Sequence, residues 1–166
     1  MAQAILLSIE GVLSKGGPPN GQPIDTGMRL FHSLRGQFKV VLSSLCPNED
    51  WIDHWLSVVG IRDLHHFAGD EELEPFEIRM AHLTAARVAA YDMGLVIDAD
   101  PQVCAEVLRQ GVPTLLFAHP RYARPEARPD YDRSLRPWGE IEEEITVQRK
   151  HQDHPLKIDA EMEPAE

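Results

Sequence analysis

Short runs of consecutive apolar residues alternate along the chain with longer stretches in which apolar residues recur every three or four positions. The short runs lie at residues 4–9, 39–42, 95–97 and 112–117, and a further short strand is expected at residues 64–67. Such runs are typical of strands that are buried on both faces, as in a parallel sheet. The pattern therefore predicts a set of short, buried, parallel strands.

The stretches between these runs have the spacing of amphipathic helices, with apolar residues on one side. Helices are expected at residues 28–36, 48–60, 74–94 and 100–111. Gly94 and Gly111 are interpreted as the residues that stop the last two, and Asp100 followed by Pro101 is a typical helix start. Residues 14–27 are rich in Gly and Pro and are expected to be irregular.

Regular alternation of strand and helix predicts a three-layer, Rossmann-like α/β sandwich, in which helices cover both faces of a parallel sheet. In such folds ligands bind at the carboxyl ends of the strands. The run at 95–97 ends at Asp98, close to Asp100, so two carboxylates are expected at that edge of the sheet.

The chain changes character after Phe117, which predicts appendages on one core. The α/β core is assigned to 1–118, a Pro/Arg-rich strap to 119–137, a C-terminal helix to 138–150 and an acidic flexible tail to 151–166. The strap arginines have two interpretations. They bind phosphate groups or carboxylates of a partner, or they pair with acidic residues of the chain itself.

Composition narrows the classes of function. The chain has 166 residues, of which 43% are hydrophobic, and a formal net charge of −11. This length suits one substantial core, and the acidic balance makes nucleic-acid binding an unlikely function overall. With neither a leader sequence nor a long apolar run, we expect no membrane association and a cytoplasmic location.

Three segments together resemble motifs of the haloacid dehalogenase-like superfamily. They are ILLSIEGVL at 5–13, VVLSS at 40–44 and LVIDADP at 95–101, the last followed by a helix and GVPTLLF at 111–117. The resemblance covers about residues 4–117 and implies that superfamily's Rossmann-like core without a cap domain. It also implies phosphate chemistry with Mg²⁺ as cofactor.

The first of these segments departs from the superfamily pattern at the position of its nucleophile. The resemblance places Ser8 where an aspartate attacks phosphorus and binds Mg²⁺, and Glu10 where a second aspartate acts as general acid and base. A serine cannot form the acyl-phosphate and is a poor Mg²⁺ ligand. Ser8 and Glu10 are thus degenerate catalytic positions, and the alternatives are a hydrogen-bonded strand-end hydroxyl and a solvated carboxylate.

The same resemblance implies roles for the other polar residues at the strand ends. Ser43, Ser44 and Arg79 are the expected phosphate-binding residues, with Arg79 the nearest counterpart of a motif lysine. Asp98 and Asp100 are the expected metal ligands, and a site with so few carboxylates would hold Mg²⁺ weakly. The alternatives are that the serines satisfy backbone groups and that Asp100 is a helix N-cap.

Three functions remain as hypotheses. The first is a pseudo-phosphatase that lost its nucleophile and serves as a binding or interaction module. The second is a divergent Mg²⁺-dependent phosphatase or phosphotransferase acting on a small or nucleic-acid-terminal phosphate. The third is a self-assembling structural component. In the first and third, residues 119–150 are the expected contact to a protein partner or to another copy of the chain.

Overall fold

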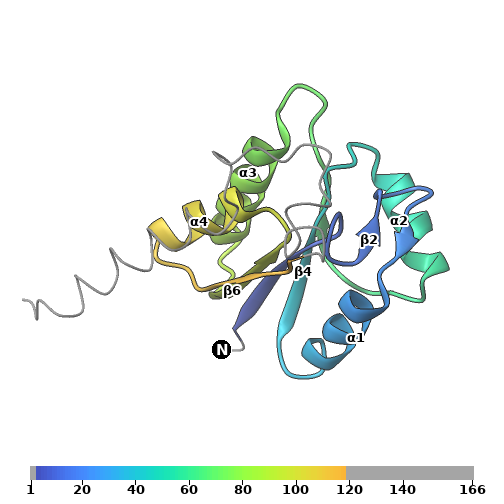
Figure 1. Cartoon of the computed structure of the whole chain (residues 1–166), viewed down its shortest axis with the longest axis horizontal. Coiled ribbons are helices and arrows are strands. Elements are labelled where there is room, and N and C mark those ends of the chain that lie inside the picture. Colours follow the sequence, from blue (N-terminus) through green and yellow to red (C-terminus); the bar gives the residue numbers. More distant parts are fainter. Residues whose placement is uncertain (1–2, 119–166) are drawn as a thin grey trace, which may run out of the picture.

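The computed structural model describes residues 3–118, in which a parallel sheet lies between two pairs of helices (Figure 1). The elements are β1 Ala4–Ser8, β2 Ser14–Lys15, β3 Gln22–Pro23, α1 Asp25–Leu34, β4 Lys39–Ser43, α2 Glu49–Val58, β5 His66–Phe67, α3 Pro75–Val88, β6 Met93–Asp98, α4 Pro101–Arg109 and β7 Thr114–Leu116. The predicted strap at 119–137, helix at 138–150 and tail at 151–166 lie outside the described residues.

The main sheet has five strands in the order β5-β4-β1-β6-β7, and every pairing among them is parallel. The central strand β1 pairs with β4 on one side and with β6 on the other. The predicted three-layer, Rossmann-like α/β fold is therefore confirmed. Its strand order brings the carboxyl ends of three sequence-distant strands next to one another.

Alternate residues of the three central strands β1, β4 and β6 contribute to two separate hydrophobic clusters. Ile5 and Leu7 of β1 pack with α1 and α2, whereas Leu6 between them packs with α3 and α4. Successive side chains of a strand point to opposite faces, so a continuous apolar run serves both layers. This explains why the central strands are unbroken hydrophobic stretches in the sequence.

Polar side chains fix the beginnings of three helices. Asn48 Oδ1 accepts from the Trp51 amide at the start of α2, and Asp100 Oδ1 accepts from the Gln102 amide at the start of α4. At the start of α3, the Glu77 carboxylate accepts from the Glu74 amide. Each bond satisfies an amide that has no partner within its helix. The expected N-cap role of Asp100 is confirmed.

Two glycines that we expected to lie outside helices and strands are parts of them. Gly94 does not stop α3, which ends at Val88, but belongs to β6. A Cβ at Gly94 would lie 3.0 Å from the Gln3 side chain, so close approach explains this glycine. Likewise α1 begins at Asp25 rather than at residue 28, and Gly27 inside it packs against the Val12 carbonyl.

The segment 14–27, expected to be irregular, contains a small two-stranded sheet. Strands β2 and β3 pair antiparallel, with Ser14 opposite Pro23 and Lys15 opposite Gln22. Each strand has only two residues. Pairs this short have too few side chains to show an alternating pattern, which is why the sequence did not reveal them.

Candidate functional site

The candidate site lies where the central strands end. Ser8 is the last residue of β1 and pairs in register with Ser43, the last residue of β4. Asp98 is the last residue of the other neighbour of β1, strand β6. Glu10 and Ser44 follow β1 and β4 within two residues. Strand order alone therefore gathers these side chains at one edge of the sheet.

Arg79 of α3 is the positive charge at the centre of this group. Its side chain is only 6% exposed. Nη1 donates to both the carbonyl oxygen and the hydroxyl oxygen of Ser43, each at 2.7 Å. Nη2 donates to Glu10 Oε2 at 2.9 Å, and Nε lies 3.3 Å from Asp98 Oδ2. One guanidinium thus joins the ends of all three central strands.

The Glu10 carboxylate lies where three hydrogen-bond donors converge. Ser44 Oγ donates to Oε1 at 2.7 Å, while the Leu45 amide donates to Oε2 at 3.0 Å. Arg79 is the third donor. A hydroxyl, a backbone amide and a guanidinium are the groups that typically bind an oxyanion. Here a carboxylate of the chain itself accepts all three bonds.

Asp98 is buried at 3% exposure and is also fully engaged. Ser8 Oγ donates to Oδ2, and the Asp100 amide donates to Oδ1 at 2.7 Å. Burial raises the pKa of Asp98 above its ordinary value, because the charged form loses its hydration; the Arg79 charge and the Ser8 hydrogen bond act in the opposite direction. Burial therefore makes Asp98 easier to protonate than an exposed aspartate.

Ser43 has a second partner, His82, one helical turn beyond Arg79 on α3. His82 Nε2 lies 2.8 Å from the Ala68 carbonyl oxygen, which can only accept, so Nε2 carries the proton. Burial lowers the pKa of His82 and favours the neutral ring. Nδ1 then accepts from Ser43 Oγ at 2.7 Å. The Ser43 hydroxyl thus donates to His82 and accepts from Arg79.

A shallow pocket of about 260 Å³ opens over part of this cluster. Its lining comprises Glu10, Leu45, Pro75, Arg79, Asp98, Ala99 and Asp100. Three of these carry carboxylates and one carries a positive charge. Ser8 and Ser43 are buried beneath it and do not line it.

The loop after β1 lies directly against the loop after β6. Gly11 has φ +86°, and a Cβ there would lie 2.6 Å from the Ala99 Cβ. A side chain at this position would therefore push the two loops apart. The glycine allows the close approach that keeps Glu10 near the end of β6.

The structure brings together Ser8, Glu10, Ser43, Ser44, Arg79 and Asp98, all of which we had selected from the sequence. Asp100 lies at the rim of the pocket, where its side chain caps α4. The sequence also allowed Glu10 to be a solvated carboxylate. The structure differs, because the Glu10 carboxylate accepts hydrogen bonds from three groups.

Two contributors were missed, the His82 ring and the Leu45 amide. His82 lies three residues after Arg79 on the buried side of α3. A polar residue at a buried helical position is a signal that could have identified it. A backbone donor such as the Leu45 amide has no signature in the sequence.

The carboxylates do not fit the needs of a divalent cation. Mg²⁺ requires near-octahedral oxygen ligands. Each of the four carboxylate oxygens of Glu10 and Asp98 already accepts a hydrogen bond from the protein. The Arg79 guanidinium lies between the two groups. Within residues 3–118, no set of three or more His, Cys, Asp or Glu side chains is arranged to hold a metal ion.

No protein-family model and no curated protein matches the chain. Among solved structures, it is similar to a chain of a structure described as a Pnkp1/Rnl/Hen1 complex, with TM-score 0.60 and 16% identity over 72% of this chain and 47% of that one. A chain of a structure described as the Pnkp1/Rnl/Hen1 RNA repair complex gives TM-score 0.58 and 15% identity over 72% and 43%.

This chain therefore spans less than half the length of those two proteins, and identities this low show a shared fold alone. A hypothetical protein from Xanthomonas campestris has 15% identity over 92% of this chain and 86% of its own, at TM-score 0.42. No helix within residues 3–118 is long and apolar enough to cross a membrane.

Proposed function

We propose that this chain is a catalytically silent, cap-less member of the haloacid dehalogenase-like superfamily, used for binding or interaction rather than hydrolysis. Support for the kinship comes from the motif residues quoted above and from their convergence at the ends of β1, β4 and β6. Support for the lack of catalysis comes from the chemistry of the side chains that meet there.

The observation that carries the proposal is the engagement of Arg79 with both acidic groups. Its guanidinium bonds Glu10 at 2.9 Å and approaches Asp98 at 3.3 Å. A metal ion bound by these carboxylates would have to displace a buried guanidinium that already has satisfied partners. Removing one partner from such a buried pair is typically costly, about 3–5 kcal/mol. The site is thus complete without a metal.

The donors expected to bind phosphate are likewise satisfied from within. Ser43 donates to His82, Ser44 donates to Glu10, and Arg79 donates to Ser43 and Glu10. A phosphate group entering the pocket would meet the Glu10, Asp98 and Asp100 carboxylates, which repel it. This arrangement supports a binding role that does not use phosphoryl transfer.

Ser8 lacks the properties of a working nucleophile. It is 2% exposed, donates to Asp98 and does not line the pocket. A nucleophile must reach the reacting atom at about 3–3.5 Å, and a substrate in the pocket has no direct approach to Ser8. The nearby histidine, His82, is bonded to Ser43 instead.

The alternative proposal is a divergent Mg²⁺-dependent phosphatase or phosphotransferase. The specific observation in its favour is the fold shared with chains of two structures described as Pnkp1/Rnl/Hen1 complexes, one of them named an RNA repair complex. A substrate with a nucleic-acid-terminal phosphate would agree with that description. The low identity gives this alternative no support at the level of residues.

Hydrolysis of p-nitrophenyl phosphate with and without Mg²⁺ separates the two proposals. We expect the full chain, Asp98→Asn and Asp100→Asn to match the buffer blank under both conditions. Asp100→Asn is the matched control, because asparagine also caps a helix. Mg²⁺-stimulated turnover that Asp98→Asn abolishes and Asp100→Asn retains would overturn the proposal and select the enzyme.

A further inference from the structure

The chain just before α3 and in its first turn combines exposed carboxylates with exposed apolar side chains. Residues 70–77 are all exposed, and five of these eight carry a carboxylate, namely Asp70, Glu71, Glu72, Glu74 and Glu77. Among them, Leu73 is 39% exposed and Phe76 is 36% exposed. Residues 63–78 contain no lysine or arginine. Residues 70–77, here termed the acidic segment, therefore form a negatively charged surface with an apolar part.

The backbone of the acidic segment is held in place at both ends. Just before it, the Gly69 amide donates to the Cys46 carbonyl oxygen at 2.8 Å. A Cβ at Gly69 would lie 2.2 Å from the Leu45 carbonyl oxygen, so the two loops are in close contact. At the other end, the Glu77 carboxylate accepts from the Glu74 amide at 3.1 Å. A surface whose backbone is already fixed loses less conformational entropy when a partner binds.

The acidic segment is continuous with the pocket of about 260 Å³ at the candidate site. Pro75 belongs to the segment and lines the pocket together with Glu10, Asp98 and Asp100. Oδ1 of Asp100 accepts from an amide of α4, whereas Oδ2 has no donor within residues 3–118. Even with Asp98 protonated, the charges of Glu10 and Asp100 exceed the single positive charge of Arg79. The pocket is therefore negative, and one carboxylate oxygen is available to a donor.

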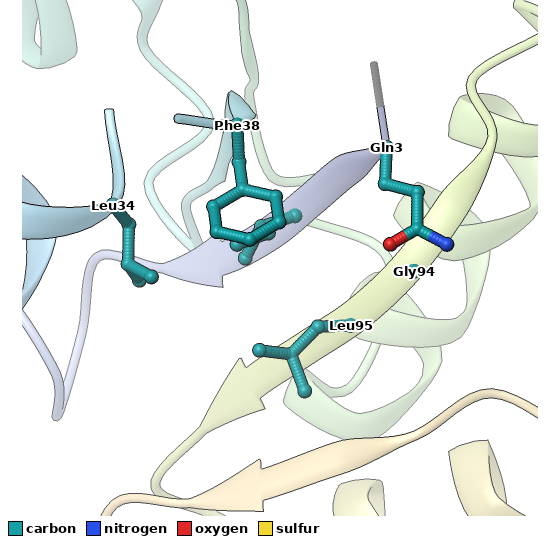
Figure 2. A pocket seen from close by; sticks show the side chains of 6 residues that line it. Gln3, Leu34, Phe38, Gly94 and Leu95 are labelled. Atoms are coloured by element: carbon teal, nitrogen blue, oxygen red, sulfur yellow. The ribbon is translucent and has the colours of Figure 1, made fainter. Parts of the chain in front are cut away.

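A second groove offers a comparison within the same molecule. It lies near the amino ends of β1 and β6, has about 240 Å³ of space and is lined by Gln3, Ile5, Leu34, Phe38, Gly94 and Leu95. Figure 2 shows Leu34, Phe38 and Leu95 around this groove, with Gln3 beside Gly94. None of these side chains is charged. A partner selected by charge therefore distinguishes the pocket at the candidate site from this groove.

We propose that the acidic segment and the adjoining pocket bind a basic segment of a partner protein, in which Lys or Arg lies next to large apolar residues. This inference rests on the proposed binding role and names the chemistry of the partner. A Lys or Arg side chain has an apolar stem that packs on Pro75 and a positive head that donates to Asp100 and Glu10. The apolar neighbours of that cation pack on Leu73 and Phe76.

Other classes of ligand fit this surface less well. The carboxylates that attract a basic segment repel nucleic acid and other phosphate-bearing ligands. A small cation such as a polyamine would leave Leu73 and Phe76 exposed to water. A basic protein segment with apolar residues satisfies both the charge and the apolar part of the surface. Charge complementarity of this kind also raises the rate of association.

Fluorescence anisotropy of a labelled peptide of alternating Lys and Leu, mixed with the full chain, tests the proposal. We expect saturable binding that weakens as salt is raised. Matched peptides in which Glu replaces Lys, or Ser replaces Leu, should not bind. Phe76→Ser and Leu73→Ser should each weaken binding by roughly fivefold to tenfold, because an apolar contact is lost. Asp100→Asn should weaken it by about threefold, since asparagine keeps the helix cap and removes the charge.

Two further variants are matched controls. Val88→Ser changes an apolar residue that is 83% exposed at the other end of α3. Asp92→Asn removes an exposed carboxylate just before β6, at the opposite end of that strand from Asp98. Both controls should bind the Lys and Leu peptide as tightly as the parent chain.

Three results would refute the inference. The first is a lack of saturable binding of the Lys and Leu peptide, or equal binding of the Glu-substituted peptide. The second is binding that neither Phe76→Ser nor Asp100→Asn weakens, which would place the peptide elsewhere. The third is a dimer mass in light scattering that Phe76→Ser abolishes, which would assign the surface to a second copy. Absence of peptide binding without hydrolysis would refute this inference alone, whereas Mg²⁺-stimulated hydrolysis would refute the proposed function whatever the peptide does.

Discussion

Arg79→Met is the substitution that addresses the candidate site most directly. Methionine keeps an unbranched side chain and removes the buried positive charge. Four interactions are lost: two with Ser43, one with Glu10 and one with Asp98. The Asp98 carboxylate, buried at 3% exposure, is left without a cation.

The expected loss can be worked from these contacts. Breaking a buried ion pair by removing one partner costs about 3–5 kcal/mol. We expect a value near the lower end, about 3 kcal/mol at pH 8, because Glu10 keeps two donors and its side chain is 17% exposed. Asp98 offers further relief, since a carboxyl group can take up a proton.

Arg79→Met should lower the free energy of unfolding less at low pH than at high pH. Burial already raises the folded-state pKa of Asp98, and the Arg79 charge opposes that rise. Removing Arg79 therefore raises this pKa further. Stability linked to a raised carboxyl pKa is present below the unfolded value of about 3.9 and is lost as pH rises through the folded value. The variant should thus lie closer to the parent protein at about pH 5 than at about pH 8.

Urea unfolding followed by tryptophan fluorescence measures the difference. Arg87→Met is the matched control, because Arg87 is an exposed arginine of the same helix that bonds Gln110. It should lose less than about 1 kcal/mol at either pH. If Arg79→Met lost no more than this control, the guanidinium would not hold the site together and the reasoning would be refuted.

Four further substitutions test neighbouring parts of the account. Ser8→Asp adds a buried carboxylate and should lose about 2–4 kcal/mol, part of which Mg²⁺ restores in a thermal melt; indifference to Mg²⁺ would contradict this. Glu10→Ala leaves three hydrogen-bond donors without their acceptor, so inorganic phosphate should raise the Tm of this variant and leave the Tm of the parent chain unchanged. Equal shifts would be evidence against the idea that the Glu10 carboxylate occupies an anion site. Because the folded-state pKa of His82 is lowered, the parent should lose stability as pH falls below about 6.5, and His82→Gln should flatten that decline in urea unfolding; parallel profiles would disprove it. Gly27→Ala places a Cβ 1.7 Å from a carbonyl oxygen of the loop after β1 and should lose about 1–3 kcal/mol, whereas Gly36→Ala, with open space, should be near neutral; similar melts for both would be evidence against this packing.

The parallel sheet was predictable because its strands are continuous apolar runs and its helices have regular periodicity. Ser8, Ser43 and Asp98 were selected because the segments that contain them resemble superfamily motifs and end predicted strands. The observed strand order brings these three residues to one edge of the sheet. Asp100 followed by Pro101 likewise identified a helix start, because capping is a local interaction.

The contacts within the site could not be predicted, because they join residues far apart in the sequence. Arg79 was selected by its position on a helix, but its bonds to Glu10 and Ser43 depend on how α3 crosses the sheet. The bond between Ser43 and His82 has the same origin. Gly94 was wrongly predicted to end a helix, because a glycine that permits close packing and a glycine that ends a helix look identical in a sequence.

Calorimetric titration of Mg²⁺ into the full chain, with and without phosphate, tests the central claim that Arg79 rather than a metal ion neutralises Glu10 and Asp98. The account predicts no saturable binding under either condition, for the parent chain and for Asp98→Asn alike. Saturable Mg²⁺ binding in the parent chain that Asp98→Asn abolishes would contradict it.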